Sequence, residues 1–194
     1  MTQQHVPLTE SGKALIAQFA QRILVLDGAM GTMIQQRNLV AKDFGGPELE
    51  GCNENLVITR PDVIRDIHAE YYAAGSDMVE TNSFGGTPLV LNEYGLGDRA
   101  LELNEASARV AREAAAKFPG PRFVAGSMGP TTKTITVTGG ITFPELVENF
   151  RVQALGLLRG GVDCLLLETA QDTRNVKAAI VGIDEASRAF GYRV

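Results

Sequence analysis

Residues 162–172 read Val-Asp-Cys-Leu-Leu-Leu-Glu-Thr-Ala-Gln-Asp, an apolar run that ends in a polar tail. Three more runs have the same form, at 23–26 (Ile-Leu-Val-Leu), 77–79 (Asp-Met-Val) and 123–125 (Phe-Val-Ala), and a helix-patterned stretch follows each tail. Short apolar runs that alternate with helices predict an α/β fold with a parallel sheet. Loops leaving the carboxyl ends of parallel strands converge, so the four polar tails predict one site.

The stretches between the runs predict helices. A short leading helix is expected over residues 8–21, and longer helices are expected over 61–75, 92–117, 143–159 and 173–189. Residues 33–60 form a long connection that is rich in glycine at its centre, and connections of this length are often functional. Residues 191–194 resemble the approach to a fifth strand.

This order of one helix and four strand–helix units leaves two architectures open. One is a doubly wound open sheet, in which the strands would not follow one another in space. The other is half of a (β/α)8 barrel, units one to four, ending before strand five. Both need right-handed crossovers between parallel strands, so the pattern of elements alone does not separate them.

Composition excludes several classes of function. The chain has 194 residues and is 44% hydrophobic, which suits one packed domain. A formal charge of −5 without a Lys/Arg run argues against a nucleic-acid partner. No apolar stretch approaches the ~20 residues of a membrane span, and no export signal is visible. With two cysteines and no disulfide framework, we expect a cytoplasmic protein.

The polar tails carry groups that suit an α-amino acid. The tail at 27–32 joins the Asp27 carboxylate to a glycine-bearing turn whose N–H groups can hold a substrate carboxylate. Glu168 follows a buried strand directly, and Thr81 and Asn82 offer neutral donors and acceptors at the end of another strand. Acidic side chains beside such a turn would hold the ammonium group and the carboxylate of one ligand.

Ordinary structural roles are the alternative for these residues. Asp27 could cap the helix that follows it, and Glu168 could form an ion pair with Arg174 or Lys177. The orientation of Glu80 is open, because its side chain could face either the site or the wall of the sheet.

Metal ligands and a nucleophilic catalytic group are not predicted. Cys52 and Cys164 lie in no CxxC pattern, and neither histidine lies in an HxxxH pattern. Cys164 falls within an expected strand and is interpreted as a small buried apolar residue, whereas Cys52 in the long connection is interpreted as a surface thiol. His68 on a helix face is interpreted as structural. No Ser-His-Asp or Cys-His arrangement can be drawn, so no catalytic residue is assigned.

Four motifs in order resemble the homocysteine S-methyltransferase family, and in particular its cobalamin-dependent members. They are Leu-Val-Leu-Asp-Gly-Ala-Met-Gly-Thr-Met-Ile at 24–34, Glu-Thr-Asn-Ser-Phe-Gly at 80–85, Val-Ala-Gly-Ser-Met-Gly-Pro-Thr at 124–131 and Leu-Leu-Leu-Glu-Thr at 165–169. The resemblance covers nearly the whole chain. It implies a TIM barrel, with residues 1–194 forming the N-terminal half of a homocysteine-binding domain.

The resemblance also implies roles for the strand-end residues. Glu168 would meet the amino group of homocysteine, and the remaining substrate-binding positions would be Asp27, Gly28, Ala29, Thr81 and Asn82. In cobalamin-dependent members a methyl group passes from methylcobalamin to zinc-activated homocysteine, giving methionine. Homocysteine and the modules that bind methylcobalamin and methyltetrahydrofolate are therefore the implied partners.

The chain departs from the family pattern in its metal site. The family binds zinc through cysteines that follow later strands of the barrel, beyond Val194, and Cys52 and Cys164 do not match them. We therefore expect this chain alone to bind neither zinc nor cobalamin and to be inactive. Two alternatives stay open: a structural half-barrel that associates with a second half or copy through open sheet edges, and a methyltransferase that uses betaine or S-methylmethionine.

Overall fold

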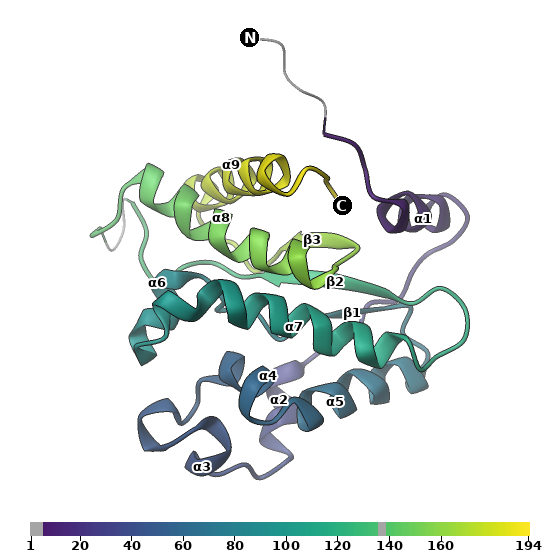
Figure 1. Ribbon diagram of the computed structural model, residues 1–194, viewed down its shortest axis with the longest axis horizontal. Helices are drawn as coiled ribbons and strands as arrows, with labels where there is room; N and C mark the ends of the chain where they lie inside the picture. Colours follow the sequence, from purple (N-terminus) through teal and green to yellow (C-terminus); the bar gives the residue numbers. More distant parts are fainter. Residues whose placement is uncertain (1–5, 136–138) are drawn as a thin grey trace.

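The computed structural model describes residues 6–135 and 139–194 as helices packed around a small parallel sheet (Figure 1). Its helices are α1 (Glu10–Phe19), α2 (Met30–Gln35), α3 (Ala41–Phe44), α4 (Leu56–Thr59), α5 (Pro61–Ala74), α6 (Pro88–Leu91), α7 (Ala100–Ala115), α8 (Phe143–Gly160) and α9 (Thr173–Phe190). Short 3₁₀ turns lie at Pro47–Leu49, Asn53–Asn55, Asn92–Tyr94 and Gly97–Arg99. None of the helices in this part of the chain is long and apolar enough to cross a membrane.

The sheet has three parallel strands, β1 (Met78–Glu80), β2 (Phe123–Met128) and β3 (Cys164–Leu167), in the order β1-β2-β3. A doubly wound sheet would place its strands out of chain order, so the consecutive order argues against that alternative. The prediction of a strand at 23–26 is wrong, because only an isolated parallel bridge from Leu26 to Met78 forms there. The run still lies beside β1, since the Asp77 N–H donates to the Val25 carbonyl at 2.8 Å.

Aspartates at the starts of two strands fasten neighbouring segments together. Asp77 accepts a hydrogen bond from the Val25 N–H at 2.9 Å and pairs with Arg22. Asp163 does the same before β3, where its carboxylate accepts the Val124 N–H at 2.7 Å and pairs with Arg112. Each aspartate thus satisfies a backbone donor of the preceding segment. It fixes that segment against the following strand, at the end of the sheet away from the polar tails.

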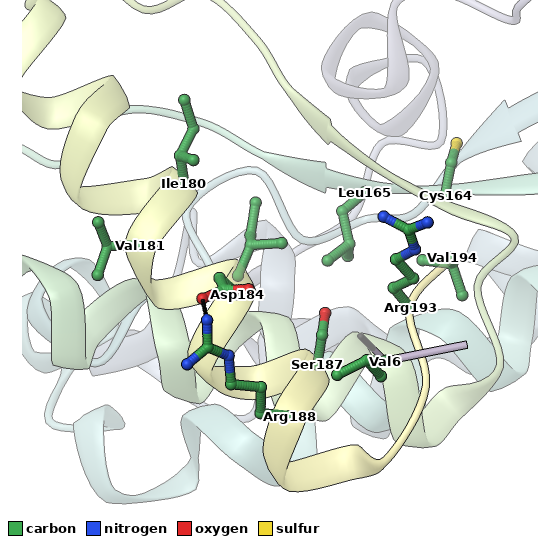
Figure 2. A pocket seen from close by; sticks show the side chains of 11 residues that line it. Val6, Cys164, Leu165, Ile180, Val181, Asp184, Ser187, Arg188, Arg193 and Val194 are labelled. Carbon is green, nitrogen blue, oxygen red and sulfur yellow. Dashed lines mark ion pairs between the residues drawn. The ribbon is translucent and has the colours of Figure 1, made fainter. Parts of the chain in front are cut away.

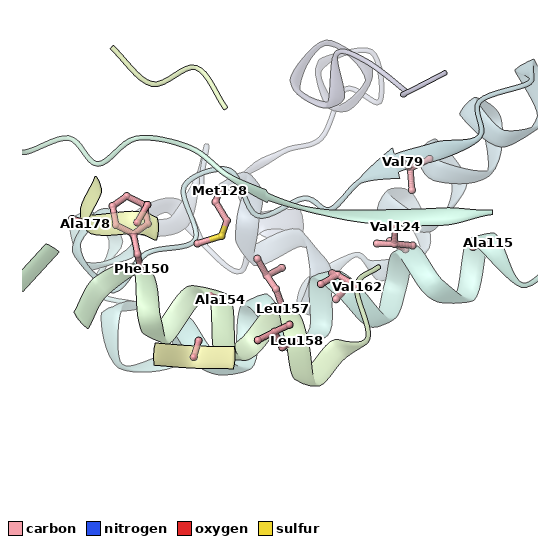
Figure 3. Packing of buried hydrophobic residues seen from close by; sticks show 14 of the residues in the cluster. Val79, Ala115, Val124, Met128, Phe150, Ala154, Leu157, Leu158, Val162 and Ala178 are labelled. Atoms are coloured by element: carbon pink, nitrogen blue, oxygen red, sulfur yellow. The ribbon is translucent and has the colours of Figure 1, made fainter. Parts of the chain in front are cut away.

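The main apolar core lies between the sheet and helices α7, α8 and α9 (Figure 3). Its fully or nearly fully buried members include Val79, Val124, Phe150, Leu157 and Ala178. Helices α7 and α8 approach closely at Gly160, where an added Cβ would lie 2.5 Å from the Glu105 carbonyl oxygen. Small residues at this crossing therefore let the helices pack tightly against the strands.

A smaller core covers the other face of the sheet. Leu15 of α1 clusters there with Met78, Phe123 and Ala125, so the leading helix lies against the beginnings of the strands. The segment before α1 forms an isolated parallel bridge between Leu8 and Arg193, in the stretch expected to begin a fifth strand. Both contacts lie at the end of the sheet away from the polar tails, which leaves the tails accessible.

The sequence predicted the long helices better than the long connection. Helix α5 begins at Pro61 and ends at Gly75, whose φ of 110° is the left-handed conformation expected of a C-terminal glycine. The connection at 33–60 is not one irregular loop, because it contains α3, α4 and two 3₁₀ turns. These short elements bury Phe44 and Leu56 in a second apolar cluster against α5 and α7.

Candidate functional site

A cavity of about 360 Å³ lies where the polar tail of the 23–26 run meets the polar residues at the ends of β1, β2 and β3. Its walls combine backbone at a glycine-bearing turn, two carboxylates and a few apolar side chains. The lining residues are Gly28, Ala29, Met30, Gly31, Glu80, Thr81, Asn82, Ser83, Phe84, Ser127 and Glu168. The carboxyl ends of neighbouring strands therefore converge on one cavity, as the sequence predicted.

Asp27 lies at the base of the first tail and is fixed by backbone contacts. Its own N–H donates to the Met78 carbonyl at 3.0 Å, and its Oδ1 accepts the Glu80 N–H at 2.9 Å. Helix α2 begins after Ala29 without a side-chain cap, so Asp27 does not take the capping role that was its alternative. Asp27 thus ties the turn at Gly28 to the end of β1.

Burial and mutual repulsion change how these acids titrate. Burial raises the pKa of Asp27 to about 7, and the nearby Glu168 adds to this shift. Burial likewise raises the pKa of Glu80 to about 7, with further contributions from Glu168 and Asp27. No ion pair among the described residues involves any of the three carboxylates, so their charge is not balanced by a neighbouring cation there. A cationic ligand would supply that balance.

Glu168 follows β3 and reaches the cavity under two restraints. Its Oε1 accepts a hydrogen bond from the Ser127 hydroxyl of β2. The next residue, Thr169, has φ 54°, a left-handed conformation that is unfavourable for a β-branched side chain and marks stored strain. The alternative ion pair with Arg174 or Lys177 does not form among the described contacts. Glu168 is therefore held toward the cavity instead of toward α9.

Thr81 and Asn82 line the cavity, but their polar groups are largely engaged within the protein. The Thr81 hydroxyl accepts the Ser127 N–H at 3.0 Å, and the Asn82 amide donates to the Asn53 carbonyl at 2.7 Å. Both residues are buried. They shape the wall of the cavity and connect it to the segment around Asn53.

The interpretation of Cys52 in this segment as a surface thiol is wrong. Cys52 is fully buried instead of lying on the surface, and burial raises the pKa of its thiol to about 11. The next two residues contact the second tail, since Asn53 accepts the Asn82 amide and Glu54 accepts the Gly85 N–H at 2.8 Å. The long connection therefore supports the cavity from behind.

A larger cavity of about 690 Å³ lies elsewhere, beside the free edge of β3 (Figure 2). Cys164 and Leu165 form one wall and Ile180, Asp184 and other residues of α9 form another. It contains none of the predicted site residues. Its size reflects an unpaired strand edge beside a helix. The smaller cavity is the candidate site, because the predicted site residues line it.

The described residues hold no cluster of three His, Cys, Asp or Glu side chains with metal-binding geometry. Burial also raises the pKa of the Cys164 thiol to about 11, which disfavours the thiolate form that zinc requires. Neither Cys52 nor Cys164 lines the cavity of the candidate site. The cysteines present therefore do not fit a zinc site for a ligand in this cavity.

Sequence reasoning missed two residues of the site and left a third undecided. Ser127 was not singled out because Gly-Ser-Met reads as a turn, and its contact with Glu168 depends on the pairing of β2 with β3. Phe84 lines the cavity and is 42% exposed, an unusual position for an aromatic ring. Glu80, whose orientation was open, lines the cavity. A polar residue next to Gly126 near the end of an apolar run was the available signal for Ser127.

Comparisons with known proteins agree with the motifs. The homocysteine S-methyltransferase family profile matches residues 24–191. Methionine synthases of Mycobacterium tuberculosis and Mycobacterium leprae are each 42% identical to this chain over 183 residues, covering 93% of it. The chain spans 15% of the length of these relatives.

Solved structures give the same result. The homocysteine methyltransferase MmuM of Escherichia coli, in its oxidized form, superposes with a TM-score of 0.73 at 26% identity, over 95% of this chain and 64% of that one. Its metallated form gives a TM-score of 0.73 at 25% identity, over 92% of this chain and 64% of that one. With the profile match over most of its length, the chain belongs to the homocysteine S-methyltransferase family.

Proposed function

We propose that this chain supplies the amino-acid-binding part of the homocysteine-binding domain of a methionine synthase. The observation that carries the proposal is the cavity where Glu80 and Glu168 lie beside a glycine-bearing turn, with Asp27 hydrogen-bonded to the Glu80 backbone and no ion pair to these acids among the described residues. Homocysteine brings an ammonium group, a carboxylate and a short apolar arm, which match the acids, the turn and the Met30–Phe84 side of that cavity.

In this proposal each part of the site has one task. Glu168 accepts the ammonium group, with Asp27 and Glu80 adding negative potential. Backbone N–H groups of the turn at Gly28 and Ala29 donate to the substrate carboxylate. Thr81 and Asn82 close the wall. These contacts bind and orient the substrate, and they leave its sulfur directed toward the open side of the cavity.

The methyl-transfer step itself is assigned outside the described residues. The family resemblance implies zinc, methylcobalamin and a methyltetrahydrofolate-binding module, but Cys52 and Cys164 do not fit the metal site. We therefore propose that these groups are held by other protein segments, and that the 194-residue chain alone forms no methionine from homocysteine and methylcobalamin. Betaine or S-methylmethionine as the methyl donor is the alternative, and supplying each donor in the same assay with added zinc distinguishes them.

Calorimetric titration with L-homocysteine tests the proposed binding site. We expect binding to the wild-type chain and at least about tenfold weaker binding to Glu168→Gln, because a charge-assisted hydrogen bond is lost. Glu102→Gln is the matched control, since Glu102 lies on the exposed side of α7 and pairs with Arg99. Equal affinities for wild type and Glu168→Gln would contradict the proposal.

A second candidate function, association of two copies as half-barrels, is favoured by the exposed apolar edges. Ile23 and Val25 beside β1 are 89% and 55% exposed, and Ile180 of α9 beside the β3 edge is 55% exposed. Unpaired strand edges of this kind favour association. We expect concentration-dependent dimers in light scattering, lost in Ile180→Asp and retained in Val40→Asp, an equally exposed position on another surface. A monomer at all concentrations would contradict this candidate.

A further inference from the structure

Two carboxylates of the cavity compete for one cation. Glu80 ends β1 and Glu168 follows β3, and both line the cavity. An α-amino acid offers a single ammonium group, so the protein must determine which of the two glutamates meets it.

Ser127 makes the two glutamates unequal. Its hydroxyl donates to Glu168 Oε1, and no described hydrogen bond joins it to Glu80. A hydroxyl has one proton to donate, so Ser127 restrains Glu168 and not Glu80.

The position of Ser127 is fixed on both sides. Its N–H donates to the Thr81 hydroxyl at 3.0 Å, and its carbonyl accepts the Ser83 hydroxyl at 2.8 Å and the Gln153 amide at 3.4 Å. The residue is 2% exposed. With its backbone held in this way, the hydroxyl is directed at Glu168 by β2 itself.

We propose that Ser127 is a positioning residue, which holds the Glu168 carboxyl in place as the acceptor of the substrate's ammonium group. This inference rests on the proposed function of the cavity. Thr169 contributes from the other side, because its hydroxyl lies 3.5 Å from Glu168 Oε2 and its left-handed backbone turns the chain directly after the glutamate. Strain retained next to such a side chain is typical of a functional position.

Two acids close to Glu168 make amino-acid binding depend on pH. Burial raises the pKa of Glu80 at the end of β1 and that of Asp27 in the first tail to about 7, and Glu168 adds to both shifts. Below about pH 7 protons on Glu80 and Asp27 weaken the negative potential, so amino-acid affinity falls.

Titration with L-methionine at pH 7 tests this role, because methionine lacks an ionisable thiol. We expect Ser127→Ala to weaken binding by about tenfold. Ser127→Thr, which keeps the hydroxyl, should restore the affinity. Ser107→Ala is the matched control: Ser107 of α7 is equally buried, and its hydroxyl has no partner among the described residues.

The possible outcomes separate the two proposals. If the wild-type chain binds neither methionine nor homocysteine, the proposed function fails. If it binds them and Ser127→Ala binds equally well, or Ser127→Thr binds as weakly as Ser127→Ala, Ser127 has only a packing role and the inference is overturned. Circular dichroism melts of each variant ensure that folded proteins are compared.

Discussion

The Asp27 carboxylate accepts the backbone N–H of Glu80 at 2.9 Å, so an acid behind the cavity holds one of the acids that line it. The bond joins the first polar tail to the end of β1, at the level of the cavity. Asp77 and Asp163 use their carboxylates in the same way at the opposite end of the sheet. Aspartates thus fasten adjacent segments at both ends, and the binding groups of Asp27 and Glu80 belong to the framework of the sheet.

The stability of the chain should depend on pH through Asp27. Its pKa is raised from 3.8 to about 7, so between these values the folded protein holds a proton that the unfolded chain releases. Its contribution to stability is therefore present below about pH 4 and is lost as pH rises through 7. We expect Asp27→Asn, which stays neutral and can still accept the Glu80 N–H, to gain stability relative to wild type between pH 5 and 8.

Urea unfolding at four pH values measures this difference. Asp184→Asn serves as the control because Asp184 is an exposed acid of α9 paired with Arg188. A stability gap between wild type and Asp27→Asn that stays constant from pH 5 to 8 would show that Asp27 is ionised throughout.

Asp163 should matter more for stability than any surface ion pair. It is 1% exposed, and its removal leaves the Val124 N–H without its acceptor and Arg112 without its partner. We expect Asp163→Ala to lower the free energy of unfolding by about 3 kcal/mol. Asp184→Ala, which breaks an exposed pair, should cost less than about 1 kcal/mol. Similar losses for both variants in urea titrations would argue against the fastening role.

The sequence predicted the long helices because their ends are encoded locally. Pro61 and Gly75 bound α5, and Thr142 with Glu145 forms a capping box before α8. The strand at 23–26 was predicted from its apolar run, but strand assignment also needs a regular ladder with a neighbour. Val25 O instead accepts two N–H groups, from Asp77 and Met78, and only one bridge forms.

In the candidate site, too, some features follow from the local sequence and others depend on how distant segments pack. Asp27 and Glu168 directly follow apolar runs, and Gly28 and Thr81 come one residue later, so the convergence of strand ends predicts that they lie near one another. The contact of Ser127 with Glu168 could not be predicted, because it depends on the register that pairs β2 with β3. The burial of Cys52 likewise depends on how the long connection packs against α5, which no local pattern encodes.

Glycines at the helix crossing should be intolerant of substitution. A Cβ at Gly160 would lie 2.5 Å from the Glu105 carbonyl oxygen of α7, so α7 and α8 must separate. We expect Gly160→Ala to destabilise the chain by about 1–3 kcal/mol despite alanine's better helix propensity. At Gly31 of α2 an added Cβ has no neighbour within 4 Å, so Gly31→Ala should be neutral or stabilising. A thermal melt in which Gly160→Ala matches wild type would show that the helices can adjust.

His68 should make the chain sensitive to acid independently of the cavity. It is fully buried on α5, and neither ring nitrogen has a partner among the described residues. Burial lowers its pKa from 6.5 to about 4, so its contribution to stability is present above pH 6.5 and is lost as pH falls through 4. Replacement by leucine removes both the unpartnered nitrogens and this titration. Urea unfolding at pH 5 and 7 should therefore show a larger advantage of His68→Leu over wild type at pH 5; an advantage that is equal at both values would show that burial does not lower the pKa of His68.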